Sequence, residues 1–89
     1  MLKPSYTKQF AKDIKRLQKR GQAQEKIKKI IEKLINEEPL PVSCRDHKLI
    51  GNYKGRRECH IEPDWLLIYK VEATEIIFER TGSHSDLFE

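Results

Sequence analysis

The hydrophobic pattern of this chain changes its period part-way along the 89 residues. Apolar residues recur every three or four positions as far as residue 35, and they alternate with polar residues from about residue 47 onward. A period near 3.6 predicts amphipathic helices, and a period of two predicts half-buried strands. We therefore expect an α+β fold, with helices in the first part of the chain and a sheet in the second.

The first 21 residues predict an extended segment followed by a helix. Residues 2–6 are expected to be extended, and Pro4 confines them to the edge of a sheet because it cannot donate a ladder hydrogen bond. Thr7 is the expected N-cap, and Gly21 is expected to end the helix. The apolar face of this helix consists of Phe10, Ile14 and Leu17.

A second helix and a series of strands are expected to follow. The helix ends before Asn36 and Pro39, and residues 83–88 form either a helical turn or a packed tail. The apolar stripe of this second helix is Ile27, Ile30, Ile31, Leu34 and Ile35. The expected strands are residues 47–50, 57–61, 65–71 and 75–81, and the short loops between them predict antiparallel neighbours.

Length and composition favour one globular unit. We expect a single domain over residues 1–89, because the chain is long enough for one core and too short for two. Its 37% hydrophobic and 36% charged residues differ from those of a disordered tail or a membrane segment. The N-terminus lacks the apolar stretch of a secretory signal, so we expect a cytoplasmic protein.

Charge is distributed unevenly along the chain. Residues 1–35 contain 11 Lys and Arg against three Asp and Glu, a net charge of +8. Residues 36–89 contain seven against 11, a net charge of −4. The N-terminal part is therefore expected to face a polyanion.

The side chains that can carry out chemistry lie mostly in the C-terminal half. Alternation along residues 57–61 places Glu58 and His60 on one face of a strand. We expect His60, Asp64, Arg80 and His84 to converge at one end of the sheet. RNA carries its own nucleophile, the 2′-hydroxyl, so cleavage requires only a base, an acid and a cation. The pattern predicts a nuclease site that needs no metal and no cofactor.

The two cysteines, Cys44 and Cys59, are expected to be reduced thiols in a cytoplasmic protein. A zinc site that combines them with His47 and His60 is disfavoured. Cys59 and His60 are adjacent on a strand and therefore point to opposite faces of the sheet.

Three motifs in combination resemble the YafQ branch of the RelE/ParE toxin superfamily. They are DHxLxG at residues 46–51, RxCHIxPDWLLIY at residues 57–69 and RTGSH at residues 80–84. The likeness is close over residues 44–88, and the order of the helices fits the family over the whole chain. Each motif is weak by itself, whereas the combination is specific.

The resemblance implies a RelE-like fold, in which two N-terminal helices pack on one face of a curved antiparallel sheet. It also implies a ribosome-dependent endoribonuclease that cuts mRNA, and a cognate antitoxin of the DinJ/RelB type. The antitoxin should be acidic where it meets the basic helices and should cover the site near His84. Carried over by position, the catalytic residues are His47, His60, Asp64, Arg80 and His84.

The residues carried over have expected roles. Arg80 should bind the scissile phosphate and His84 should act as general acid, with His60 or Asp64 as general base. Phe88 should stack on a nucleobase or orient His84. Further candidates for substrate contact are Trp65, Glu58 and Arg57, and Glu58 stands where some relatives have aspartate.

Structural roles remain open for several of these residues. His47 and His60 also fit simple hydrogen bonding, Trp65 also fits core packing, and Arg80 also fits a surface ion pair. Two other functions remain open as well, a non-catalytic ParE-like toxin and a basic RNA-binding module. Neither alternative requires His84 or Arg80, so substitution of these residues separates them from the nuclease.

Overall fold

The computed structural model describes residues 1–49, 51 and 55–88. The strand predicted at residues 47–50 begins as expected but ends at Lys48, and Ile50 lies outside the described residues. The C-terminal tail forms a short helix, which the pattern left open. In chain order the elements are β1 (Lys3–Tyr6), α1 (Lys8–Lys19), α2 (Gln24–Ile35), the 3₁₀ helix η1 (Val42–Cys44), β2 (His47–Lys48), β3 (Arg57–Glu62), β4 (Trp65–Glu72), β5 (Glu75–Gly82) and α3 (His84–Phe88).

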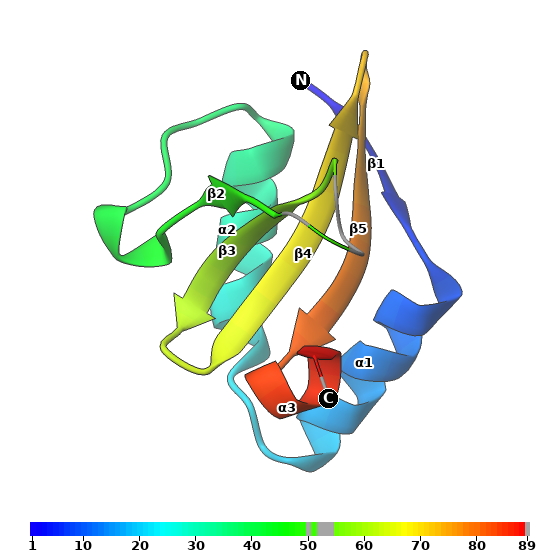
Figure 1. The fold of residues 1–89 in the computed structure, drawn as a ribbon, viewed down its shortest axis with the longest axis vertical. Helices are drawn as coiled ribbons and strands as arrows, with labels where there is room; N and C mark the ends of the chain where they lie inside the picture. Colours follow the sequence, from blue (N-terminus) through cyan, green and yellow to red (C-terminus); the bar gives the residue numbers. More distant parts are fainter. Residues whose placement is uncertain (50, 52–54, 89) are drawn as a thin grey trace.

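The five strands form one sheet in the order β1-β5-β4-β3-β2. Strands β2 to β5 are antiparallel neighbours, as predicted, whereas β1 runs parallel to β5. The expectation of a wholly antiparallel sheet is therefore corrected at β1. No hairpin joins β1 to β5, because α1 and α2 follow β1 directly and the rest of the sheet comes later in the chain (Figure 1). Pro4 lies in this edge strand, as its missing donor requires.

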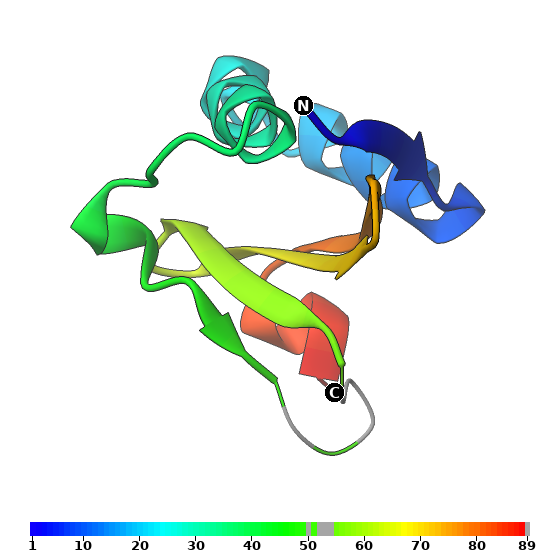
Figure 2. The same cartoon turned by 90° about the horizontal axis from the view of Figure 1, so that it is seen from above.

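Helices α1 and α2 cover one face of the curved sheet (Figure 2). Thr7 caps α1, since its Oγ1 accepts from the Phe10 amide at 3.0 Å and donates to the Glu79 carbonyl at 2.8 Å. No helix in the described ranges is long and apolar enough to cross a membrane. The core between helices and sheet includes Phe10, Leu17, Ile27, Ile30, Trp65, Leu67, Tyr69, Ile76 and Phe78.

The second face of the sheet carries α3 (Figure 2). Leu87 of α3 packs there against Leu66 and Ile68 of β4, and Leu49 lies against the same small cluster. Alternation along β3 places Glu58 opposite Ile68 and His60 opposite Leu66, so both side chains lie on this face. Glu58 and His60 therefore lie on the face that also carries α3, with His84 and Phe88.

A bulge in β5 decides where Arg80 lies. Phe78 pairs with Tyr69 and Arg80 pairs with Ile68, which leaves Glu79 as the extra residue. Strict alternation from Ile76 and Phe78 would place Arg80 on the helical side. The bulge instead directs the Cβ of Arg80 to the face of Ile68, because paired residues on neighbouring strands share a face. The guanidinium itself is bound by Asp13 of α1.

Candidate active site

Four rings lie in a row on the second face of the sheet. They belong to His47 on β2, His60 on β3, and His84 and Phe88 on α3. The ring centroids are 6.2 Å apart between His47 and His60, 6.1 Å between His60 and His84, and 6.2 Å between His84 and Phe88. We call these four residues the ring row. The structure thus brings together three predicted catalytic histidines and the predicted stacking residue.

Glu58 lies beside two imidazoles of the ring row. Its side chain is 8% exposed, and its Oε1 is 3.4 Å from His60 Nε2 and 3.9 Å from His47 Nε2. The Nδ1 atom of His60 is buried and has no hydrogen-bond partner among the described residues. Glu58 is therefore the acceptor that faces the other nitrogen of His60, Nε2, and it also lies near Nε2 of His47.

The backbone of Arg45 fixes the orientation of His47. His47 Nδ1 lies 2.6 Å from the Arg45 carbonyl oxygen. A carbonyl only accepts, so Nδ1 carries the proton and Nε2 points toward Glu58. Because half of the His47 side chain is exposed, its ring is oriented by this bond and remains open to solvent.

Asp64, in the turn between β3 and β4, holds His84 by two contacts. Its Oδ1 lies 2.7 Å from His84 Nδ1 and accepts from the His84 backbone N–H at 2.9 Å. These hydrogen bonds, first the backbone one and then that of the ring, lower the pKa of Asp64 below its ordinary value. Asp64 is thus a charged acceptor that directs the opposite nitrogen of His84, Nε2, away from itself.

Helix α3 is anchored by a reciprocal cap and an ion pair. Ser83 N–H donates to Asp86 Oδ2 at 2.9 Å, and Asp86 N–H donates to Ser83 Oγ at 3.1 Å. Arg20, just beyond the end of α1, donates to both oxygens of Asp86 at 2.7 and 2.9 Å. The close approach of Asp86 to Gly82, where an added Cβ would meet the Asp86 Cβ at 2.9 Å, requires glycine at that position. These contacts fix the two members of the ring row that α3 carries.

Acidification is expected to release α3 from the sheet. Hydrogen bonds from Arg20 hold the pKa of Asp86 well below the ordinary value of 3.8, against the opposing effect of burial. The stabilisation is therefore fully present above pH 3.8 and is lost as the pH falls through the lower pKa of the folded state. Amide exchange at Leu87, followed by NMR from pH 6 downward, should show protection that persists below pH 3.8. Arg20→Gln should move its loss to higher pH, and an unchanged profile would contradict this role of Arg20.

Arg80 is held by a buried carboxylate that the sequence analysis did not single out. Asp13 of α1 is 0% exposed, and it accepts from Arg80 Nε at 2.8 Å and Nη2 at 3.1 Å. Asp13 also accepts from Arg16 and, at 3.1 Å, from the backbone N–H of Thr81. Thr81 lies in the part of β5 that extends past its pairing with β1. A signal was present in the pattern, because Asp13 lies on the apolar side of its helix with Phe10 and Leu17.

Two other candidates lie away from the ring row. Trp65 is 1% exposed in the core beneath α1 and α2, and its indole N–H donates to Thr81 Oγ1 at 3.0 Å. Arg57 is paired with Asp46, which also accepts from the Tyr69 hydroxyl at 2.7 Å. The structure thus gives Trp65 the packing role and places Arg57 in a separate polar cluster.

The cysteines and the possible metal ligands occupy different faces. Cys44 and Cys59 are free thiols in the helical core, and burial, followed by contact with Cys44, raises the pKa of Cys59 far above its ordinary value. On the second face, Glu58, His60 and His84 each offer a ligand atom within 4.8 Å of the others. One carboxylate and two imidazoles are a donor set that suits a first-row transition metal.

Comparison with known proteins identifies the family of this chain. The family model described as a bacterial toxin of type II toxin-antitoxin system, YafQ, matches residues 2–89. The chain belongs to the YafQ family of toxins. A YafQ relative from Escherichia coli K12, named mRNA interferase toxin YafQ, is 48% identical over 84 residues, which cover 93% of this chain and 91% of that protein.

Two solved structures extend the YafQ comparison. The E. coli DinJ-YafQ toxin-antitoxin complex matches with a TM-score of 0.92 and 45% identity, covering 99% of this chain and 98% of that chain. A metal-bound toxin from Helicobacter pylori matches with a TM-score of 0.92 and 40% identity, covering 99% and 100%. The expected YafQ family and its fold are thereby confirmed.

Proposed function

We propose that this protein is an endoribonuclease, the toxin of a type II toxin-antitoxin pair, and that it cuts mRNA on the ribosome in the cytoplasm. The observation that carries the proposal is the ring row, in which a carboxylate adjoins each of two imidazoles on one face of the sheet. The 48% identity to a protein named as an mRNA interferase supports the same reaction.

The cleavage step uses two imidazoles on either side of the phosphate. His60 takes the proton of the 2′-hydroxyl while the oxygen of that hydroxyl forms a bond to phosphorus. Glu58, beside His60, stabilises the imidazolium that this step creates. His84, oriented by Asp64, gives a proton to the 5′-oxygen as the bond from phosphorus to that oxygen breaks. Of the two bases left open by the sequence, His60 fits better, because the lowered pKa makes Asp64 a weak base.

Positive charge at the phosphate is assigned to Arg80. Its guanidinium is shared with Asp13, which fixes two of its donors, and the side chain is 22% exposed. A fixed guanidinium stabilises the charge that develops on the phosphate oxygens without reorganising during the reaction. Phe88, 45% exposed at the end of the ring row, offers a face on which a base can stack.

Metal binding at the ring row is a second candidate, because Glu58, His60 and His84 form a donor set and a relative is described as metal-bound. An ion at these three residues would occupy the imidazole nitrogens that move protons. We therefore infer that it would compete with the acid–base reaction.

Two partners follow from the surface. Lys8, Lys12, Lys15 and Lys19 are exposed on α1 and suit ribosomal RNA, whose backbone is a polyanion. A cognate antitoxin, of the kind seen in the DinJ-YafQ complex of a relative, would block the site by covering α3 near His84. Its contacting segment is expected to be acidic where it meets α1.

The test is to map mRNA ends in a translating extract. Wild-type protein, stripped with EDTA and dialysed before addition, is expected to generate new 5′-hydroxyl ends that are absent when ribosomes are omitted. Cleavage that returns only after a metal ion is added would favour the metal-dependent alternative. Arrested translation with intact mRNA would favour the non-catalytic toxin, and RNA binding without arrest would favour the binding module.

A further inference from the structure

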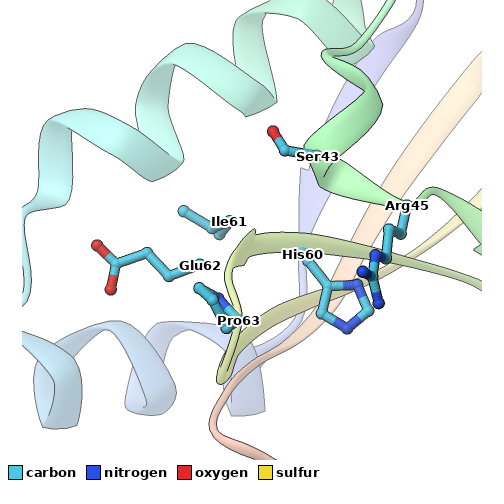
Figure 3. A pocket seen from close by; sticks show the side chains of 6 residues that line it. All are labelled: Ser43, Arg45, His60, Ile61, Glu62 and Pro63. Carbon is cyan, nitrogen blue, oxygen red and sulfur yellow. The ribbon is translucent and has the colours of Figure 1, made fainter.

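A pocket opens beside His60 at the outer edge of β3. Its volume is about 340 Å³, and it lies where η1 approaches the turn between β3 and β4 (Figure 3). The residues that line it are Ser43, Arg45, His60, Ile61, Glu62 and Pro63. His60 belongs both to this pocket and to the ring row, so the pocket adjoins the ring row at that residue.

Arg45 is distinguished from the other arginines by its lack of an ion pair. The guanidinium of Arg45 has no acidic partner among residues 1–49, 51 and 55–88, and its side chain is exposed. Each of the other five is paired: Arg16 and Arg80 with Asp13, Arg20 with Asp86, Arg56 with Glu79, and Arg57 with Asp46. Arg45 is thus the arginine whose charge the described part of the fold leaves uncompensated.

The backbone at Arg45 is held in an unusual conformation. Arg45 has φ 47° and ψ 45°, the left-handed region that residues with a Cβ rarely adopt. Its N–H donates to the Val42 carbonyl at 3.1 Å, and its own carbonyl accepts from His47 Nδ1. The backbone of Arg45 therefore orients His47 of the ring row. Backbone strain of this kind is concentrated at functional sites.

The remaining lining residues suit a nucleotide. Ile61 and Pro63 offer apolar surface, and Glu62 is already paired with Lys26 of α2, which reduces its repulsion of an anion. A guanidinium binds phosphate through two parallel hydrogen bonds, in bidentate geometry. The charge of Arg45, the apolar surface and the contact with the ring row thus favour a nucleotide as the ligand.

We propose that this pocket is a subsite for the nucleotide next to the scissile phosphate, with Arg45 binding that nucleotide's own phosphate. The ribose or base rests against Ile61 and Pro63. This inference rests on the proposed function, because it assumes that RNA lies along the ring row. It assigns Arg45 to the binding of the strand and leaves proton transfer to His60 and His84.

The test uses ribosomes programmed with a short synthetic mRNA, and it measures the toxin concentration for half-maximal cleavage and the rate at saturation. Arg45→Gln should raise the half-maximal concentration roughly tenfold and leave the saturated rate unchanged, since one charge-assisted contact is lost. Two further mRNAs carry a neutral methylphosphonate, one on each side of the scissile phosphate. One of these mRNAs lacks the charge of the phosphate that Arg45 binds. On it, the wild type should need the same raised half-maximal concentration that Arg45→Gln needs on the unmodified mRNA, and Arg45→Gln should raise that concentration no further.

A matched control removes one positive charge elsewhere. Lys3→Gln changes an exposed residue of β1, at the opposite edge of the sheet, and should alter neither quantity on any of the three mRNAs. Equal effects of the two variants, or a loss in Arg45→Gln that persists on both modified mRNAs, would overturn the subsite. A loss of antitoxin binding without a change in cleavage would overturn it also. Failure of the wild type to cut any mRNA would instead overturn the proposed function, and the subsite with it.

Discussion

Replacing His84 by glutamine is expected to lower the rate of mRNA cleavage by roughly 10²- to 10⁴-fold, the usual contribution of a positioned general acid. Glutamine can still hydrogen bond to Asp64, but it cannot deliver a proton to the 5′-oxygen. His84 is 55% exposed, so its replacement removes little packing. The variant should therefore unfold at the wild-type temperature while its single-turnover cleavage rate on programmed ribosomes falls.

Ser85→Ala is the matched control for this prediction. Ser85 is exposed on α3 next to His84, and its replacement should leave the cleavage rate unchanged. If His84→Gln cuts mRNA at the wild-type rate, proton transfer does not involve this residue. If both variants lose activity together, the loss reflects α3 as a whole.

Replacing Asp13 by alanine is expected to lower the free energy of unfolding by about 3–5 kcal/mol, the typical cost of removing one partner of a buried ion pair. The carboxylate is fully buried, and its removal leaves the Arg80 guanidinium and the Thr81 amide without the acceptor described above. Urea unfolding followed by the fluorescence of the single tryptophan, Trp65, measures the loss. Cleavage should fall as well, because Arg80 is no longer held in place.

Glu25→Ala provides the comparison on the neighbouring helix. Glu25 is exposed in the first turn of α2, so its removal should change stability by no more than about 0.5 kcal/mol. A loss below about 1 kcal/mol in Asp13→Ala would show that Arg80 and Thr81 find other partners, and it would contradict the role assigned to this carboxylate.

Local patterns in the sequence predicted most of the elements correctly. The stripe of Phe10, Ile14 and Leu17 and the cap at Thr7 appear where the helical period places them, because capping and amphipathicity are properties of neighbouring residues. Alternation likewise placed Glu58 and His60 on one face, opposite Cys59. The motifs then identified the family, and the three histidines that they carry meet in the ring row.

Only the tertiary structure decided the features that depend on partners distant in the chain. Three such features are the direction of β1 beside β5, the burial of Trp65 and the contact between Asp13 and Arg80. Each depends on contacts between segments separated by many residues, and no local period encodes such contacts. The bulge at Glu79 has the same origin, because register belongs to a pair of strands and one extra residue reverses the face of all that follow. Residue types and spacing therefore determined which reactive groups this protein carries, and long-range packing decided which of them meet.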